Sequence, residues 1–147
     1  MDALSFEPAW PAPVPAHQYP TVRQYMTPSL CTIAHHQPLT IAQRTMAEHG
    51  IRHLPVLDGD EVIGVLSEHD LLLVRSLRGT NPAEVRVEEA MVPDAYVVTP
   101  DTPIAEVAFT LMERRIGCAI VMDDDRPIGV FTTIDALRVL TDMLAEK

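Results

Sequence analysis

The sequence has few of the residues on which several protein classes depend. Only two of its 147 residues are cysteines, Cys31 and Cys118, and they form no Cys-x-x-Cys pair. A disulfide framework and a thiolate metal site are therefore not expected. Lysine and arginine number 11 against 21 acidic residues, which gives a formal charge of -10, and the basic residues are scattered. Because nucleic acids and anionic membranes attract clustered positive charge, neither is an expected partner.

Long apolar runs and catalytic signatures are also missing. No stretch approaches the roughly 20 apolar residues that cross a bilayer, and the N-terminus lacks the basic start and apolar core of a signal peptide. We therefore expect a cytoplasmic protein. Aromatic residues make up 5% of the chain, so the core must consist of Val, Ile, Leu, Met and Ala. The G-x-S-x-G, P-loop and G-x-G-x-x-G patterns are absent, and we expect no enzyme.

The chain does contain an internal repeat. A shift of 65 positions aligns residues 22–73 with residues 87–138 without a gap. Identical residues recur at matched positions: Met26 and Met91, Pro38 and Pro103, Thr45 and Thr110, Ile51 and Ile116, Gly64 and Gly129, and Asp70 and Asp135. We therefore expect a Pro-rich arm (1–20), a first repeat (21–78), a connector (79–86) and a second repeat (87–147).

Each repeat predicts the same series of elements. After a short strand, Pro38 or Pro103 stands where the first residue of a helix would be, because proline has a preset φ and needs no amide there. Two strands follow (53–57 and 62–66; 118–122 and 127–131), joined by turns such as Asp58-Gly59-Asp60. A second helix begins near residue 68 or 133. The fold class is α+β, with two β-α-β-β-α units.

Neither repeat, at roughly 50 residues, can bury its apolar helix and sheet faces alone. We expect the two repeats to pack into one module with pseudo-two-fold symmetry. The arm before them is rich in proline and carries Trp10, the single tryptophan. Two interpretations of the arm stay open: a tail that is draped over the module or disordered, and a peptide that holds a second subunit through Trp10.

The repeats agree most closely where the last strand meets the last helix. Residues 64–70 and 129–135 both read G-h-h-[S/T]-x-x-D, where h is apolar. In a structural interpretation, Ser67 and Thr132 are N-caps, and Asp70 and Asp135 complete capping boxes. In a functional interpretation, the helix N-terminus and the hydroxyl bind a phosphate, and the carboxylate accepts both hydroxyls of a ribose. Apolar residues nearby would form a slot for a purine ring: Ile51, Val65, Ile116 and Val130.

These features together resemble the CBS (cystathionine-β-synthase-type) domain, and the pair resembles the tandem CBS, or Bateman, module. The resemblance rests on Met-x-Pro, the proline at the helix start, the strand from His53 to Asp58 and the G-h-h-[S/T]-x-x-D ending, and it covers roughly residues 21–140. It implies a regulatory module that forms a homodimer and binds an adenosine-type ligand (AMP, ADP, ATP or S-adenosylmethionine) between its repeats. It also implies an effector protein as partner and no required cofactor.

The resemblance further implies which residues bind the ligand. Ser67 and Asp70, and likewise Thr132 and Asp135, would contact the phosphate and the ribose. The residues lining the two clefts would be Ile51, His53, Val65, Ile116, Cys118 and Val130. Repeat one has Arg52-His53 where repeat two has Gly117-Cys118, so a charged phosphate should prefer the first cleft. The second cleft could bind more weakly, take an uncharged nucleoside or stay empty.

Other functions compete with this one. The chain could be a ligand-independent dimerisation or assembly module, in which the S/T-x-x-D segments only cap helices. An enzyme working through His53 and Asp70 is a third alternative. Six histidines suggest a metal, yet no His-x₃-His lies on one predicted helix face, so no metal site is expected. The acidic turn at residues 123–125 lacks the Gly and distal Glu of a calcium loop and is interpreted as a solvated turn.

Overall fold

The computed structural model describes residues 20–145. The first half contains α1 (Val22–Tyr25), β1 (Thr27–Pro28), β2 (Ile33–Ala34), α2 (Leu39–His49), β3 (His53–Asp58), β4 (Glu61–Ser67) and α3 (Glu68–Ser76). The second half contains α4 (Val87–Ala90), β5 (Val92–Pro93), β6 (Val97–Val98), α5 (Ile104–Arg114), β7 (Cys118–Asp123), β8 (Arg126–Thr132) and α6 (Thr133–Ala145). Except for Pro20, the arm predicted for residues 1–20, with Trp10, lies outside the described residues.

The β-α-β-β-α order predicted for each repeat is confirmed. The four hairpin strands begin and end within one residue of the predicted positions, and α3 and α6 begin at residues 68 and 133 as predicted. The placement of the two prolines was wrong by one residue. Pro38 (ψ 153°) and Pro103 (ψ 137°) are N-caps with extended backbone, and the helices begin at the next residue. The extended conformation lets each proline form a β-bridge, Pro38 with Arg86 and Pro103 with Thr21.

The two sheets exchange their edge strands between the repeats. One sheet has the order β2-β3-β4-β5 and the other β6-β7-β8-β1, and the 65-residue shift converts one order into the other. Val92 of the second repeat pairs with Val65, and Thr27 of the first repeat pairs with Val130. Because the same pairing occurs twice with the partners reversed, the two repeats are related by the predicted pseudo-two-fold symmetry.

A glycine in each repeat makes this exchange possible. A Cβ atom at Gly64 would lie 2.7 Å from the carbonyl oxygen of Val92, and one at Gly129 would lie 2.5 Å from the carbonyl oxygen of Thr27. Neither distance leaves room for a side chain. The glycine of the G-h-h-[S/T]-x-x-D segment is therefore required by the close approach of the exchanged strand, whether or not a ligand binds.

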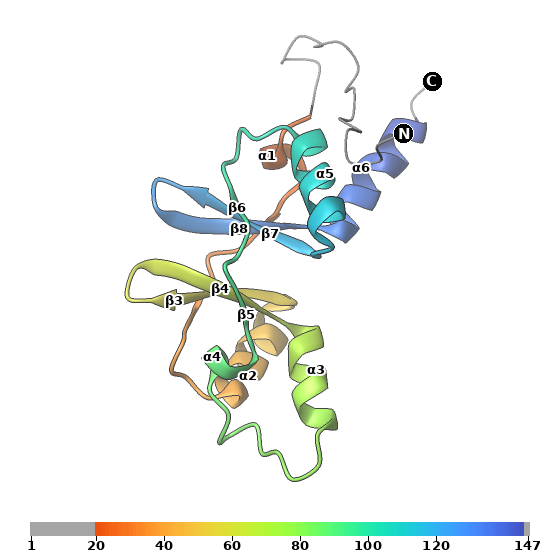
Figure 1. Ribbon diagram of the computed structural model, residues 1–147. Coiled ribbons are helices and arrows are strands. Elements are labelled where there is room, and N and C mark those ends of the chain that lie inside the picture. Colours follow the sequence, from red (N-terminus) through yellow and green to blue (C-terminus); the bar gives the residue numbers. More distant parts are fainter. Residues whose placement is uncertain (1–19, 146–147) are drawn as a thin grey trace, which may run out of the picture.

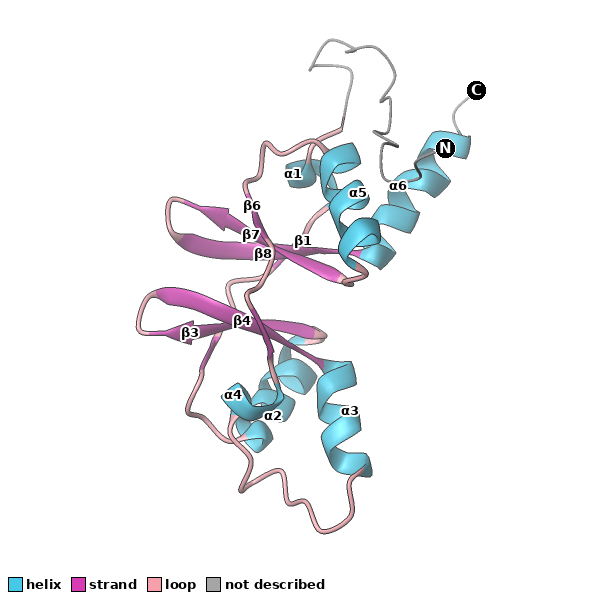
Figure 2. Ribbon diagram, in the orientation of Figure 1, coloured by secondary structure: helices cyan, strands magenta, loops and turns pink. Residues whose placement is uncertain are grey.

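The module consists of two stacked lobes with their sheets in the middle and their helices outside (Figures 1 and 2). The first lobe is the β2-β3-β4-β5 sheet with α2, α3 and α4, and the second is the β6-β7-β8-β1 sheet with α5, α6 and α1. Val87 of α4 is fully buried in the core of the first lobe, and Val22 of α1 in that of the second. Each core thus contains residues of the other repeat. Aliphatic side chains dominate as predicted, although the largest fully buried side chain is Phe131.

Candidate functional site

Both S/T-x-x-D segments cap a helix. In the first repeat, the Ser67 amide donates to Oδ2 of Asp70 at 2.8 Å, and the Asp70 amide donates to Oγ of Ser67 at 3.1 Å. In the second, the Thr132 amide donates to Oδ2 of Asp135 at 2.9 Å, and the Asp135 amide donates to Oγ1 of Thr132 at 3.3 Å. The predicted capping boxes are confirmed. Each uses only one oxygen of its carboxylate.

The other carboxylate oxygen distinguishes the two repeats. Within residues 20–145, Oδ1 of Asp70 has no hydrogen-bond partner, and the residue is partly exposed. In contrast, Oδ1 of Asp135 accepts a hydrogen bond from the Arg138 guanidinium at 3.1 Å and one from the Thr27 hydroxyl at 3.1 Å. Asp135 is 1% exposed. The carboxylate of Asp70 can therefore accept a further donor, whereas that of Asp135 must first lose one.

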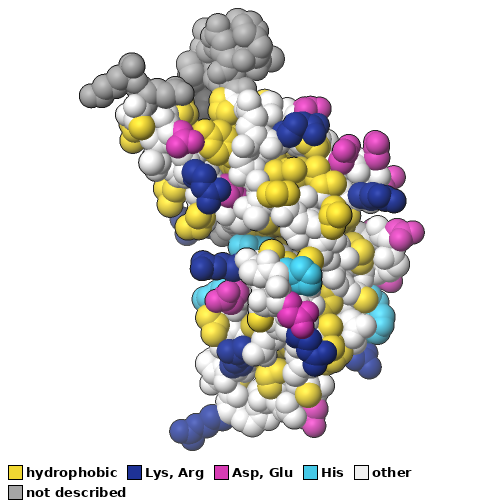
Figure 3. Space-filling model, turned by 180° about the vertical axis from the view of Figure 1, so that it is seen from behind, with side chains coloured by type: hydrophobic (Ala, Val, Ile, Leu, Met, Phe, Trp, Pro, Cys, Tyr) yellow, Lys and Arg dark blue, Asp and Glu magenta, His cyan; other side chains and the backbone are white. Residues whose placement is uncertain are grey.

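A cavity of about 570 Å³ opens beside Ser67 and Asp70. Its walls come from both repeats: the start of β3, the end of β4 and the start of α3 on one side, and residues 92, 94–96 and 115–118 on the other. Six of the ten predicted binding residues line it, namely His53, Val65, Ser67, Asp70, Ile116 and Cys118. Histidine side chains lie mainly near the level where the two lobes meet, whereas Lys and Arg side chains are spread over this face (Figure 3).

The other four predicted residues lie elsewhere. Ile51 lines a smaller hollow of about 210 Å³, together with Met46 and Leu71. Val130, Thr132 and Asp135 line neither space, and all three are buried. Their contact with a ligand stays a prediction.

The residues that the second repeat adds after its exchanged strand were missed by sequence reasoning. Asp94, Ala95 and Tyr96 follow β5 and line the cavity. The signal that locates them is the exchange itself: β5 pairs with β4 of one sheet and β6 pairs with β7 of the other, so residues 94–96 must cross between the two sheets. Arg114 lies over the Tyr96 ring, 5.2 Å from its centre, and so covers one face of that ring.

Arg115 was also missed, although the sequence carries a local signal for it. The 65-residue shift matches Arg115 with Gly50, and both residues follow an 11-residue helix in the left-handed region, with φ 55° and φ 62°. Glycine adopts this conformation freely, but an L-residue is strained there. Arg115 therefore keeps a strained backbone conformation where the first repeat has a glycine, and its side chain lines the cavity.

The charged side chains in the cavity are of both signs. Arg52, Arg115, His53 and His69 are basic, and Glu68, Asp70 and Asp94 are acidic. Arg52 lies 4.0 Å from Glu68, at the limit of an ion pair. Within the described residues, the Arg115 side chain forms neither an ion pair nor a hydrogen bond, so its charge is available to an anion.

His53 and Cys118 occupy matched positions in the two repeats, and both are uncharged near neutral pH. Burial lowers the pKa of His53 below its usual 6.5, although the negative charges of Asp70 and Asp135 oppose this shift. Burial raises the pKa of the Cys118 thiol to about 12, and the charge of Asp135 adds to the effect. A thiol with this pKa is protonated and is a poor nucleophile. These two residues therefore form a neutral part of the cavity wall.

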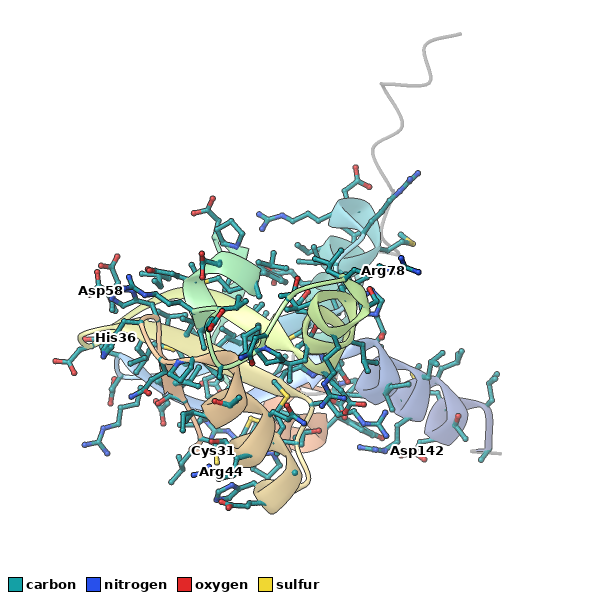
Figure 4. All side chains as sticks on the ribbon, turned by 90° about the horizontal axis from the view of Figure 1, so that it is seen from below. Cys31, His36, Arg44, Asp58, Arg78 and Asp142 are labelled. Atoms are coloured by element: carbon teal, nitrogen blue, oxygen red, sulfur yellow. The ribbon has the colours of Figure 1, made fainter. Side chains whose placement is uncertain are left out.

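His35 lies away from the cavity that His53 and His69 line. His35 lies 2.6 Å from Glu88 through Nδ1 and 3.6 Å from Asp58 through Nε2. Figure 4 shows Asp58 and His36 close together at one edge of the module, at the end of the β3–β4 hairpin. Between residues 20 and 145, no group of three or more His, Cys, Asp and Glu side chains could hold a metal ion. No helix in this part of the chain is long and apolar enough to cross a membrane.

Comparison with known proteins identifies the repeat. The family model of the CBS domain matches the chain twice, at residues 22–76 and 87–142. The chain belongs to the CBS domain family. This CBS domain pair is 27% identical over 123 residues to hypoxic response protein 1 of Mycobacterium tuberculosis, an alignment that covers 83% of this chain and 86% of that protein.

Solved structures of other CBS domain pairs share the fold. CBSX2, solved in complex with AMP, is 25% identical, with a TM-score of 0.68 and coverage of 84% of this chain and 97% of that chain. The CBS domain pair of protein MJ0100, solved with 5′-methylthioadenosine and S-adenosyl-L-methionine, is 22% identical, with a TM-score of 0.71 and coverage of 85% and 98%. Because the MJ0100 pair is only 22% identical to this chain, the comparison with it concerns the fold alone. The predicted tandem CBS architecture is confirmed.

Proposed function

We propose that this CBS domain pair is a non-catalytic regulatory module that binds an adenine nucleotide between its repeats and signals to a partner protein. The observation that carries the proposal is the convergence, in one cavity of about 570 Å³, of the free Oδ1 of Asp70, the N-terminus of α3 and the Arg115 side chain. A cavity of this size matches ordinary small-molecule sites. The AMP bound by CBSX2 supports the choice of ligand class.

Each group in the cavity corresponds to a part of AMP. The free oxygen of Asp70 would accept hydrogen bonds from the ribose hydroxyls. The amides of Glu68 and Asp70 already donate to the Arg52 carbonyl and to Oγ of Ser67, so the positive end of α3 would face the phosphate through the His69 amide and the helix dipole. Arg52 and Arg115 would supply positive charge. Val65 and Ile116 would contact the purine. S-adenosylmethionine has no phosphate, and its single carboxylate is offset by an ammonium and a sulfonium, so it would match two arginines less well than a phosphate does. We therefore propose AMP, ADP or ATP as the ligand.

The two matched aspartates provide the test. In Asp70→Asn, one side-chain oxygen still caps α3, but the second acceptor becomes a donor. AMP affinity should fall at least tenfold, while stability changes by less than about 1 kcal/mol. In Asp135→Asn, the charge-assisted contact with Arg138 is weakened, so stability should fall by roughly 1.5–3 kcal/mol while AMP affinity is kept.

Isothermal titration and urea unfolding of both variants measure these two effects. The proposal fails if AMP, ADP and ATP produce no binding heat with the unmodified protein at millimolar concentration. It also fails if Asp70→Asn binds AMP as tightly as the unmodified protein does.

The exposed apolar side chains of α3 and α6 favour a second function, which is self-association. α3 and α6 lie on the same side of the module in two views (Figures 1 and 4). Large apolar side chains on or next to them are more than half exposed: Leu72, Leu73, Leu77, Ile134, Leu137, Leu140, Met143 and Leu144. Large apolar side chains exposed in this number on one side of a protein favour a protein–protein contact. We therefore propose a homodimer that buries this face.

Sedimentation of the unmodified protein and of Leu137→Glu/Leu140→Glu tests the homodimer. We expect a dimer for the first and a monomer for the second. A dimer that forms without ligand, in a protein that binds no nucleotide, would instead support the ligand-independent assembly module.

A further inference from the structure

The two repeats of this pair differ at matched positions around the capping carboxylate. Under the 65-residue shift, Asp135 corresponds to Asp70, Thr27 to Val92 and Arg138 to Leu73. The backbone positions are equivalent as well, because Thr27 lies opposite Val130 on the exchanged strand β1, just as Val92 lies opposite Val65 on β5. The same place in the fold therefore holds two hydrogen-bond donors in one cleft and two aliphatic side chains in the other.

In the second cleft these donors fill the carboxylate. The Thr27 hydroxyl lies 3.1 and 3.3 Å from the two oxygens of Asp135, and the Arg138 guanidinium lies 3.1 Å from Oδ1. The Thr132 amide and hydroxyl lie 2.9 and 3.2 Å from Oδ2. Four donors thus share a carboxylate that has about four acceptor sites. With the residue 1% exposed, no acceptor site faces open space.

In the first cleft the corresponding oxygen stays free. Asp70 accepts hydrogen bonds only from the amide and hydroxyl of Ser67 within the described residues. Neither Val92 nor Leu73 has a side-chain donor, and Val92 lines the cavity. The carboxylate of Asp70, which lines the cavity, therefore keeps acceptor capacity on Oδ1.

We propose that Thr27 and Arg138 close the second cleft to adenosine-type ligands, so that each chain binds one nucleotide, in the first cleft. This inference rests on the proposed function and specifies which cleft performs it. A ribose diol entering the second cleft would have to displace both donors and leave a guanidinium without its carboxylate partner. Such an exchange loses as many hydrogen bonds as it forms. Thr27 and Arg138 thus determine specificity, because they donate to the Asp135 oxygen that would otherwise accept the ribose hydroxyls.

The test transfers the two donors to the first cleft. Isothermal titration of the full chain with AMP should give one site per chain. In Leu73→Arg/Val92→Thr, AMP affinity should fall at least tenfold, because the new donors can fill Asp70. Both side chains are about half exposed, so the fold should tolerate the change. Leu77→Arg, which adds the same charge at the C-cap of α3, is the matched control and should bind AMP as the unmodified protein does.

The reverse change, Thr27→Val/Arg138→Leu, should open the second cleft and give a second AMP site per chain. Two AMP sites in the unmodified protein would overturn the inference and leave the proposed function intact. An unchanged AMP affinity in Leu73→Arg/Val92→Thr would also overturn the inference. A single AMP site in a folded Thr27→Val/Arg138→Leu variant would do the same. If the unmodified protein binds no AMP, the proposed function itself is overturned, and this inference with it.

Discussion

Replacing Arg115 by glycine should separate ligand binding from folding, because the structure gives the two effects opposite signs. The left-handed backbone of Arg115 (φ 55°) costs an L-residue roughly 1–2 kcal/mol, a strain that glycine does not have. Part of this gain, about 0.4–1 kcal/mol, is offset because glycine gives the unfolded chain more conformational freedom than arginine does. The free energy of unfolding of Arg115→Gly should therefore stay unchanged or rise by up to about 1.6 kcal/mol.

The same variant should bind AMP more weakly. A hydrogen bond to a charged group contributes about 1.5–3 kcal/mol, and we take the lower end because Arg115 is exposed. About 1.4 kcal/mol corresponds to a tenfold weaker AMP affinity. Adenosine, which has no phosphate, should bind the variant and the unmodified protein equally.

Isothermal titration with AMP and adenosine, combined with urea unfolding, measures both effects. Arg126→Gln, in the β7–β8 hairpin away from the cavity, removes the same charge and should change neither affinity. Equal losses for AMP and adenosine, or a clear loss of stability in Arg115→Gly, would refute the reasoning.

Three further predictions concern individual residues. Iodoacetamide should modify the partly exposed Cys31 before Cys118, whose thiol has a pKa of about 12, and peptide mapping that shows equal rates would contradict this. Burial holds the pKa of His53 below 6.5, so as the pH falls the His53 imidazole is protonated in the unfolded chain before it is protonated in the folded protein. The free energy of unfolding should therefore fall as pH decreases below 6.5. An equal fall in His53→Gln would count against His53 as the cause. Gly129→Ala should lower stability by about 1–3 kcal/mol in urea unfolding, whereas Gly117→Ala, with open space around it, should change little.

Much of the fold could be predicted because the strongest local signals occur twice. Asp58-Gly59-Asp60 marks a hairpin turn, and Ser67 with Asp70 marks a helix start, and both features form as expected. The exchange of β1 and β5 could not be predicted in the same way. A two-residue strand has no periodicity to read, and the partner of Thr27 lies more than 100 residues away at Val130. Only the three-dimensional packing around Gly64 and Gly129 requires it.

The candidate site was partly predictable for a related reason. The repeat alignment locates Ser67 and Asp70, and both line the cavity. It assigns each cleft to its own repeat, however, and so misses Tyr96 and Arg115, which the exchange brings from the other repeat. Whether a capping aspartate keeps a free oxygen depends on side chains outside the motif. No pattern of residues in the S/T-x-x-D segment distinguishes Asp70 from Asp135.

The duplicated scaffold supplies two matched capping carboxylates, and a small number of substitutions makes their surroundings different. Three matched pairs of positions carry the difference: Val92 and Thr27, Leu73 and Arg138, and Arg115 and Gly50. Two of these pairs decide whether the carboxylate is free, and the third decides where the extra positive charge lies. If these pairs are sufficient, exchanging all six residues should transfer AMP binding to the second cleft. Titration would then show that Asp135→Asn weakens AMP binding in the exchanged protein while Asp70→Asn does not. AMP binding that still depends on Asp70 would mean that residues beyond these three pairs select the cleft.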